Sequence, residues 1–216
     1  MATYPYCQSV LIVIGFSFII SSCHQDEGCD YLTEGKVEKG VFIQEELGWS
    51  MSLPESYLLL DSSEYVRIAN VGNEAAFGNS MEKTCTQNLA RWITVKDNDS
   101  VKVFINCDPV TSHPEGFEFS QETHNIFTRL ASERNFDYWD STFSVELSGF
   151  RWKGMMSEFV MNGVFYQKMY ETLYRDRYIV ISISGRNLQM IEDWSQRFEQ
   201  SKFGKRDSTL AYQTTK

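Results

Sequence analysis

The Asn162–Gly163 pair restricts the fold of this chain more than any other feature. An Asn-Gly step readily adopts the positive φ angles of a two-residue hairpin turn, whose twist matches that of the strands it joins. Runs rich in apolar residues flank it at 152–161 and 164–174. The sequence therefore predicts a hairpin of two long antiparallel strands.

Other segments share the alternating or β-branched pattern of strands. They are 40–54, 90–96, 101–107, 141–150 and 178–185, with a short apolar run at 57–60. The tetrapeptide Asp97–Ser100 is rich in turn-forming residues and joins two of these strands as a hairpin. Strands connected by such tight turns pair antiparallel.

Two segments show the apolar spacing of amphipathic helices. The first begins near Ser120, which we expect to be its cap, and runs to about Arg134. Its apolar face is Phe119, Thr123, Ile126, Phe127 and Leu130. The second spans about 187–201, with Leu188, Ile191, Trp194 and Phe198 on one stripe. A weaker helical pattern covers 61–77 and is interrupted by Gly72.

These elements predict an α+β fold, in which an antiparallel sheet of hairpins and a meander is flanked by helices. The chain has 216 residues, of which 42% are hydrophobic. A chain of this length and composition forms one ordinary domain without needing a metal or disulfide. No internal repeat indicates a second domain.

The N-terminus has the pattern of an export leader. Val10 to Ile20 are eleven uncharged, largely apolar residues, which suits a signal peptide, whereas a membrane-spanning helix needs about 20. The quartet Ile20–Cys23 resembles a bacterial lipobox, although no Lys or Arg precedes the apolar run. In proteins with that motif the leader is removed and the cysteine is acylated, which anchors the protein to a membrane. We therefore expect a signal peptide at 1–22 and lipidation of Cys23.

The segment after Cys23 is polar and acidic. It resembles the segment that follows the lipid cysteine in surface-exposed lipoproteins of Bacteroidetes-type bacteria, and we expect a polar tether at 23–39. Metal binding by Cys23, His24 and Cys29 is disfavoured, because adjacent Cys and His chelate poorly and no fourth ligand is near. No CxxC motif occurs, and Asp97–Asp99 lack the glycine and glutamate of a calcium loop. We predict no metal and no cofactor.

The remaining chain resembles the PsbP/Mog1-like fold. The family pattern "F…GWS…LP" is matched by Phe42 to Pro54, and a closing meander, helix and "S-x-F" by residues 169–203. The resemblance implies a PsbP/Mog1-like domain at 40–203, followed by a polar tail at 204–216. It also implies a binding or accessory module, and no catalytic residues accompany it.

The sequence shows no recognisable active site. His113 and His124 lie in a proline-flanked loop and on a predicted helix, and no GxSxG motif occurs. The net charge of −9 disfavours a nucleic-acid partner. Cys85 and Cys107 are close enough along a hairpin to form a disulfide, but the sequence favours two free thiols.

One aromatic face is a candidate binding surface. In the strand 164–174, Tyr166, Tyr170 and Tyr174 alternate with the more apolar Phe165, Met169 and Leu173. Tyrosine is well suited to binding surfaces. The alternative is that a helix or the tether covers this face.

We therefore predict a lipid-anchored envelope protein, held at the outer membrane by Cys23 and displayed at the surface or facing inward. Its expected role is a non-catalytic binding or accessory module for an unidentified protein or small molecule. An envelope hydrolase is the alternative, which a buried cluster of His113 or His124 with an acid would favour.

Overall fold

The computed structural model describes residues 35–60, 90–97, 101–110, 115–175 and 177–204. Several predictions concern residues outside these ranges. They are the leader at 1–22, Cys23, His24, Cys29, the helical pattern at 61–77, Cys85, His113 and the tail from 205 onward.

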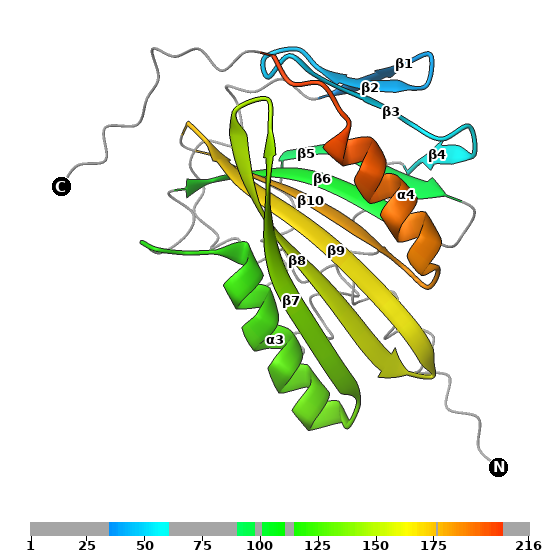
Figure 1. Cartoon of the computed structure of the whole chain (residues 1–216), viewed down its shortest axis with the longest axis vertical. Coiled ribbons are helices and arrows are strands. Elements are labelled where there is room, and N and C mark those ends of the chain that lie inside the picture. The colour runs from blue at the N-terminus through cyan, green and yellow to red at the C-terminus, as the bar shows by residue number, and fades with distance from the viewer. Residues whose placement is uncertain (1–34, 61–89, 98–100, 111–114, 176, 205–216) are drawn as a thin grey trace.

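A seven-stranded antiparallel sheet forms the body of the domain, with the strand order β4-β5-β6-β10-β9-β8-β7 (Figure 1). The strands are β4 (Tyr57–Leu59), β5 (Ala90–Asp97), β6 (Val101–Pro109), β7 (Asp137–Leu147), β8 (Phe150–Met161), β9 (Gly163–Tyr174) and β10 (Arg177–Gly185). Every neighbouring pair is antiparallel. The predicted α+β class with an antiparallel sheet is confirmed.

The β8–β9 hairpin turns at the predicted position, but not through the predicted two-residue Asn162–Gly163 turn, because Gly163 is itself paired and only Gly163 of the two has a positive φ. Met161 is paired with Gly163, and the register continues without a shift to Lys153 opposite Glu171. This register fixes which side chains of the two longest strands lie next to each other.

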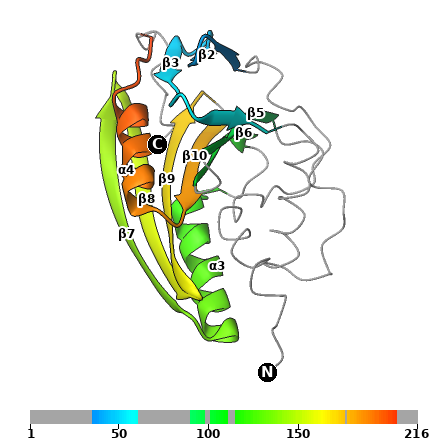
Figure 2. The ribbon, with the colours of Figure 1, turned by 90° about the vertical axis from the view of Figure 1, so that its right-hand side faces the viewer.

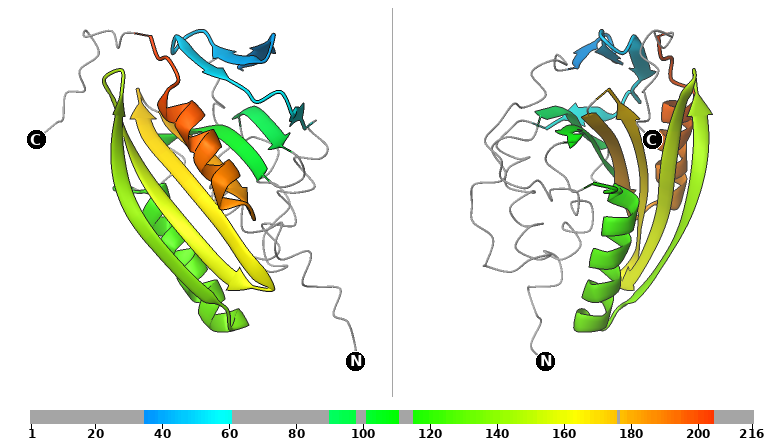
Figure 3. Two further views of the ribbon diagram at one scale, coloured as in Figure 1. Left: turned by 45° about the vertical axis from the view of Figure 1, so that its right-hand side comes forward. Right: turned by 90° about the vertical axis from the view of Figure 1, so that its left-hand side faces the viewer.

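Two helices cover opposite faces of this sheet, α3 (Phe119–Arg134) and α4 (Leu188–Glu199) (Figure 3). Alternation along β9 shows the division. Met169 packs with Phe119 of α3, whereas the ring of Tyr170 lies 4.6 Å from that of Phe198 of α4. The predicted apolar face of α3 is buried, but the stripe of α4 starts only at Ile191, because Leu188 is 40% exposed.

The core on the α4 face contains one buried carboxylate. Asp97 is 4% exposed and accepts hydrogen bonds from the indole nitrogen of Trp194 at 3.0 Å and the hydroxyl of Ser56 at 2.6 Å. A buried charge is tolerable when donors replace its water. Asp97 therefore links α4, β5 and the segment before β4.

A second, small sheet of β1 (Lys36–Glu38), β2 (Val41–Gln44) and β3 (Trp49–Ser52) lies across one end of the large sheet (Figure 2). β1 falls within the predicted tether at 23–39, yet its three residues pair with β2. The paired structure therefore begins before residue 40. The sequence did not indicate this strand, because Lys36 and Glu38 are polar and lie on an exposed edge.

The chain end returns to this small sheet. Ser50 and Lys202 exchange two backbone hydrogen bonds, and the indole of Trp49 donates to the hydroxyl of Ser201. Trp49 also stacks on Phe203 with ring centroids 5.1 Å apart. The first and last parts of the described domain thus share one core.

No helix in the described ranges is long and apolar enough to cross a membrane.

Candidate functional site

A groove of about 590 Å³ lies where the start of α3 meets strands β7, β8 and β9. This volume is in the range of small-molecule sites. Its lining is Phe117, Glu118, Thr142, Phe143, Ser144, Arg151, Lys153, Glu171, Thr172, Leu173 and Tyr178. The groove combines four charged groups, several hydroxyls and an apolar wall, which makes it the candidate binding site.

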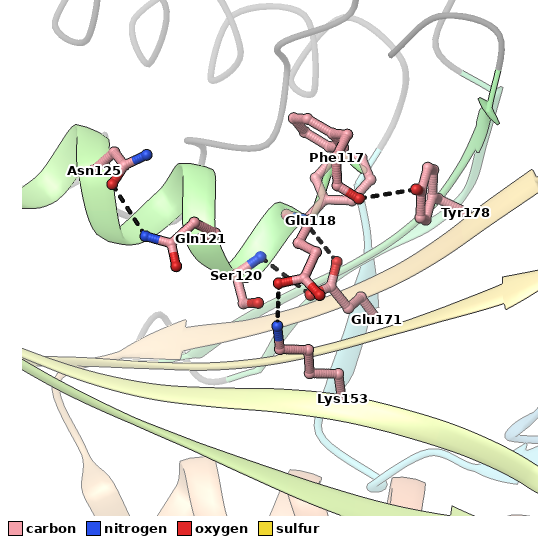
Figure 4. Close-up of polar contacts among 9 residues, drawn as sticks. Phe117, Glu118, Ser120, Gln121, Asn125, Lys153, Glu171 and Tyr178 are labelled. Atoms are coloured by element: carbon pink, nitrogen blue, oxygen red, sulfur yellow. Dashed lines mark hydrogen bonds and ion pairs between the residues drawn. The ribbon is translucent and has the colours of Figure 1, made fainter. Parts of the chain in front are cut away.

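Glu171 of β9 closes the N-terminus of α3. Its side chain accepts hydrogen bonds from the backbone N–H of Phe119 at 2.8 Å and of Ser120 at 3.1 Å (Figure 4). Glu171 is 6% exposed, and these amides and the positive end of the helix dipole offset its charge. The helix terminus is therefore already occupied by a carboxylate of the protein itself.

The prediction that Ser120 caps α3 is wrong. The N-cap position is Glu118, whose side chain makes no capping hydrogen bond. Ser120 lies inside the first turn, and its buried hydroxyl has no hydrogen-bond partner among the described residues. The distant Glu171 takes the role that local sequence assigned to Ser120.

Lys153 holds the second acid of the groove. Its ammonium group forms an ion pair and hydrogen bond with the carboxylate of Glu118 (Figure 4). Lys153 also lies directly opposite Glu171 in the β8–β9 register. Each carboxylate of the groove thus has an internal partner, Glu118 through a lysine and Glu171 through helix amides.

Arg151 is different. It lies two residues before Lys153 in β8, so both side chains project from the same face. Arg151 is exposed, and its guanidinium forms no ion pair or hydrogen bond within the part of the chain that the structure describes. A guanidinium has five N–H donors that suit a carboxylate or phosphate.

The other walls supply hydroxyls and apolar surface. Thr142 and Ser144 of β7 are exposed, and Leu173 of β9 is 41% exposed. Tyr178 donates a hydrogen bond to the carbonyl oxygen of Phe117 at 2.9 Å, which holds the loop before α3 against the sheet (Figure 4). A molecule in the groove could place an anionic group at the guanidinium of Arg151, form hydrogen bonds with the hydroxyls and pack against the apolar wall.

Sequence reasoning missed this groove, although a signal was present. A hairpin centred on Asn162 pairs residues at equal distances from the turn, which places Lys153 opposite Glu171. The predicted two-residue turn would instead pair Lys153 with Thr172, so counting outward from it would have brought the two charges within one residue of each other but not opposite. The position of α3 above them required the structure.

The predicted tyrosine surface is wrong, because α4 covers it. Tyr170 is fully buried, and its hydroxyl donates to Glu199 of α4 at 2.6 Å. Burial raises the pKa of Tyr170 above its ordinary value, and the hydrogen bond to Glu199 raises it further. Tyr166 and Tyr174 are partly buried against the same core. The alternative of a covering helix is what the structure shows.

His124 meets an acid, but at the surface. Its Nδ1 lies 2.6 Å from Asp140 of β7, and the histidine side chain is 46% exposed. The hydroxyl of Tyr138 donates to the same Asp140 oxygen and not to the histidine, so it is not placed as a nucleophile that His124 could activate. Burial raises the pKa of Tyr138, and Asp140 adds to this. The pair therefore differs from the buried cluster expected of a hydrolase.

Cys107 is fully buried in β6 and forms a disulfide. The expectation of a free thiol at this position is therefore wrong. The other four cysteines lie outside the described residues, so pairing with Cys85 stays a prediction. Within the described ranges, no group of three metal-binding side chains occurs.

Comparisons with known proteins give structural similarity alone. No protein-family model matches the chain, and no curated protein matches it by sequence. The structure of CyanoP, the cyanobacterial PsbP of Synechocystis sp. PCC 6803, is similar at a TM-score of 0.46 and 8% identity, over 86% of this chain and 99% of that one. The structure of LpqN, involved in cell envelope biogenesis of Mycobacterium tuberculosis, is similar at a TM-score of 0.39 and 9% identity, over 83% of this chain and 87% of that one. The structure of PA94, a protein of unknown function from Pseudomonas aeruginosa, is similar at a TM-score of 0.34 and 6% identity, over 78% of this chain and 96% of that one.

Proposed function

We propose that this chain is a lipid-anchored accessory protein of a bacterial envelope, and that it binds a small anionic molecule in the groove beside α3 without transforming it. The proposal places Cys23 at the outer membrane as the lipid attachment point and assigns the domain to the PsbP/Mog1-like group. One observation carries the binding role. Arg151 is the one charged group of the groove whose side chain has no partner among the described residues.

The charge balance of the groove supports an anionic ligand. Glu118 is paired with Lys153, and Glu171 is bonded to two helix amides. Arg151 has no hydrogen bond or ion pair among the described residues, so its N–H donors are available, and Glu146 is the acid opposite it on β7. A bound carboxylate or phosphate would form charge-assisted hydrogen bonds with this guanidinium.

The shape and composition of the groove support a ligand with polar and apolar parts. The hydroxyls of Thr142 and Ser144 lie on the β7 side, and Leu173 offers its exposed apolar surface on the β9 side. Among the described residues, the lining contains no histidine and no cysteine. This set of side chains favours binding over acid–base or nucleophilic chemistry.

The family assignment rests on the two sequence motifs. Trp49 belongs to the first and Phe203 to the second, and their rings stack. The two motifs therefore pack against each other in one core, which gives a structural reason for finding them in the same chain.

N-acetylphenylalanine and its uncharged amide form a matched probe pair for the groove. They share a ring and differ in the carboxylate that Arg151 would bind. Isothermal titration calorimetry should show weak binding of the acid and at least tenfold weaker binding of the amide. Arg151→Gln should abolish this preference, whereas Arg186→Gln, a change at an exposed arginine outside the groove, should preserve it. Equal binding of acid and amide by the unaltered protein would contradict the proposal.

The lipid anchor has a separate test. Cys23→Ala should prevent acylation and release the protein from the membrane fraction, as seen by fractionation and intact mass. Cys29→Ala removes a nearby cysteine outside the lipobox-like quartet and should leave both properties unchanged. Membrane retention of the Cys23 variant would refute the anchor without affecting the groove.

A further inference from the structure

A layer of polar side chains crosses the α3 face of the large sheet. Asp140, Ser157, Gln167 and Ser184 lie directly opposite one another along β7, β8, β9 and β10. Ser157 and Gln167 are fully buried, and Ser184 is 3% exposed. Because a polar group loses its solvent water on burial, each member of this polar layer needs a hydrogen-bond partner inside the protein.

Apolar clusters flank the polar layer on both sides. On one side, Phe119 of α3 packs with Met155 and Met169, each two residues along its strand from the layer. On the other side, the ring of Phe127 lies 4.6 Å from that of Phe159, again two residues from the layer. α3 therefore runs along the strands and passes over the polar layer between these two contacts (Figure 1).

Thr123 is the residue of α3 that meets the polar layer. It lies midway between the two phenylalanines of the helix and is 1% exposed. Four residues of an α-helix rise about 6 Å, which matches the roughly 7 Å spanned by two residues of a strand. Thr123 is therefore level with Ser157 and Gln167. The next residue, His124, contacts Asp140, the β7 member of the same layer, which agrees with this placement.

Three buried oxygen atoms of this contact have no hydrogen-bond partner within the part of the chain that the structure describes. They are Oγ1 of Thr123, Oγ of Ser157 and Oε1 of Gln167. The amide nitrogen of Gln167 donates to Ser182 at 3.0 Å, so Oε1 is the free end of an amide whose orientation is fixed. Burial raises the pKa of Tyr138 and the nearby Ser157 hydroxyl partly offsets this rise, although the two hydroxyls form no hydrogen bond. Polar groups that are close without bonding directly are the usual partners of a bridging water.

We propose that one water molecule is buried between α3 and the sheet and is bound by Thr123, Ser157 and Gln167. The phenylalanine and methionine side chains on both sides hold α3 away from the sheet, whereas Ser157 and Thr123 are short, which leaves room between them. Buried waters typically make about three hydrogen bonds to polar groups that otherwise lack partners. The water donates to Oε1 of Gln167, which can only accept, and its other bonds go to the two hydroxyls, which can donate or accept.

A high-resolution crystal structure of the full chain tests the site directly. We expect the electron density of a single water within about 3 Å of Oγ1 of Thr123, Oγ of Ser157 and Oε1 of Gln167. In Ser157→Val, the two methyl groups take the place of the water, and this density should disappear. Ordered density that fits another molecule, or no density in the unaltered protein, would overturn the proposal.

Unfolding in urea tests the same site in solution and separates it from a dry interface. Thr123→Val keeps the shape of the side chain, and Ser157→Ala removes only the hydroxyl. In a dry interface, either change removes an unpaired polar group and leaves the protein equally or more stable. If the water is bound, each change should lower the folding equilibrium constant at least threefold. The double variant should lose less than the product of the two single effects, because both act on one water.

Thr128→Val on α3 and Ser141→Ala on β7 make similar changes at exposed positions and should alter the folding equilibrium constant less than twofold. Two results would contradict the buried water. One is a Thr123 or Ser157 variant as stable as the unaltered protein, and the other is a double variant that loses the full product of the single effects.

Discussion

The carboxylate of Glu171 lies 2.8 Å from the backbone nitrogen of Phe119 and accepts its hydrogen bond. The two residues are 52 positions apart, on β9 and at the start of α3. This contact fixes the angle at which α3 leaves the sheet, and it also forms the floor of the groove. Stability and the shape of the candidate site therefore depend on the same side chain.

Glu171→Gln should lower the free energy of unfolding by about 1–2 kcal/mol, because the amide offers one acceptor oxygen and no charge at the helix N-terminus. Urea unfolding followed by circular dichroism measures this. Glu133→Gln, at an exposed position in the last turn of α3, should cost no more than about 0.5 kcal/mol. Equal losses in the two variants would show that Glu171 does not cap the helix.

Ser120→Ala distinguishes the structure from the local sequence signal. A capping serine contributes about 1 kcal/mol, so its loss should be plainly measurable. The Ser120 hydroxyl is buried without a partner in the described part of the chain, so the alanine variant should be equal in stability or slightly more stable. A loss near 1 kcal/mol in the same urea experiment would restore Ser120 as the cap.

The fold was predictable where the signals were local. The Asn162 turn, the β-branched strand of β10 and the apolar face of α3 from Phe119 to Leu130 each depend on residues close in sequence. The lengths of β7 and β1 were not predicted, because the exposed residues of an edge strand carry little apolar pattern.

The candidate site depended on contacts between distant segments, and these the sequence did not show. Alternation correctly grouped Tyr166, Tyr170 and Tyr174 on one face of β9. It did not show that α4 would pack there, although the stripe with Trp194 and Phe198 needed a surface to cover. Assigning that helix to the tyrosine face would have left the other face of β9, with Glu171, as the candidate.

Stability should fall in alkaline solution because of Tyr170. Its pKa is raised in the folded protein, so the folded state holds the phenol proton that the unfolded state releases near pH 10. The contribution of the protonated Tyr170 to the free energy of unfolding is fully present below that pH. It is lost as the pH rises, by up to about 1.4 kcal/mol per pH unit. Denaturant unfolding between pH 8 and 11 should therefore show a shallower alkaline decline for Tyr170→Phe. Parallel declines would contradict the role of this tyrosine.

The partner of Cys107 should be Cys85. Ala90 lies opposite Cys107 in the β5–β6 pair, and Cys85 is five residues before Ala90. Peptide mass spectrometry without reduction should find the two cysteines linked, and Cys85→Ser should make the Cys107 thiol available for alkylation after denaturation. Cys29→Ser is the control and should leave the link intact. A link between Cys107 and Cys29 would disprove the pairing. A bridge closing a loop of this size contributes about 3 kcal/mol.

Gly48 and Gly40 provide a matched test of how the chain end docks on the small sheet. Both have positive φ, at 56° and 75°, so alanine strains the backbone at either site by about 1 kcal/mol. A Cβ at Gly40 meets nothing within 4 Å, whereas at Gly48 it would lie 2.7 Å from the Cα of Gly204. Gly48→Ala should therefore cost at least about 1 kcal/mol more than Gly40→Ala, since the backbone of the last segment must move away. Amide hydrogen exchange at Ser50 and Lys202 should speed up in the Gly48 variant alone, because their paired hydrogen bonds depend on that close approach. Equal losses of stability and unchanged exchange would mean that the last segment is not held by this contact.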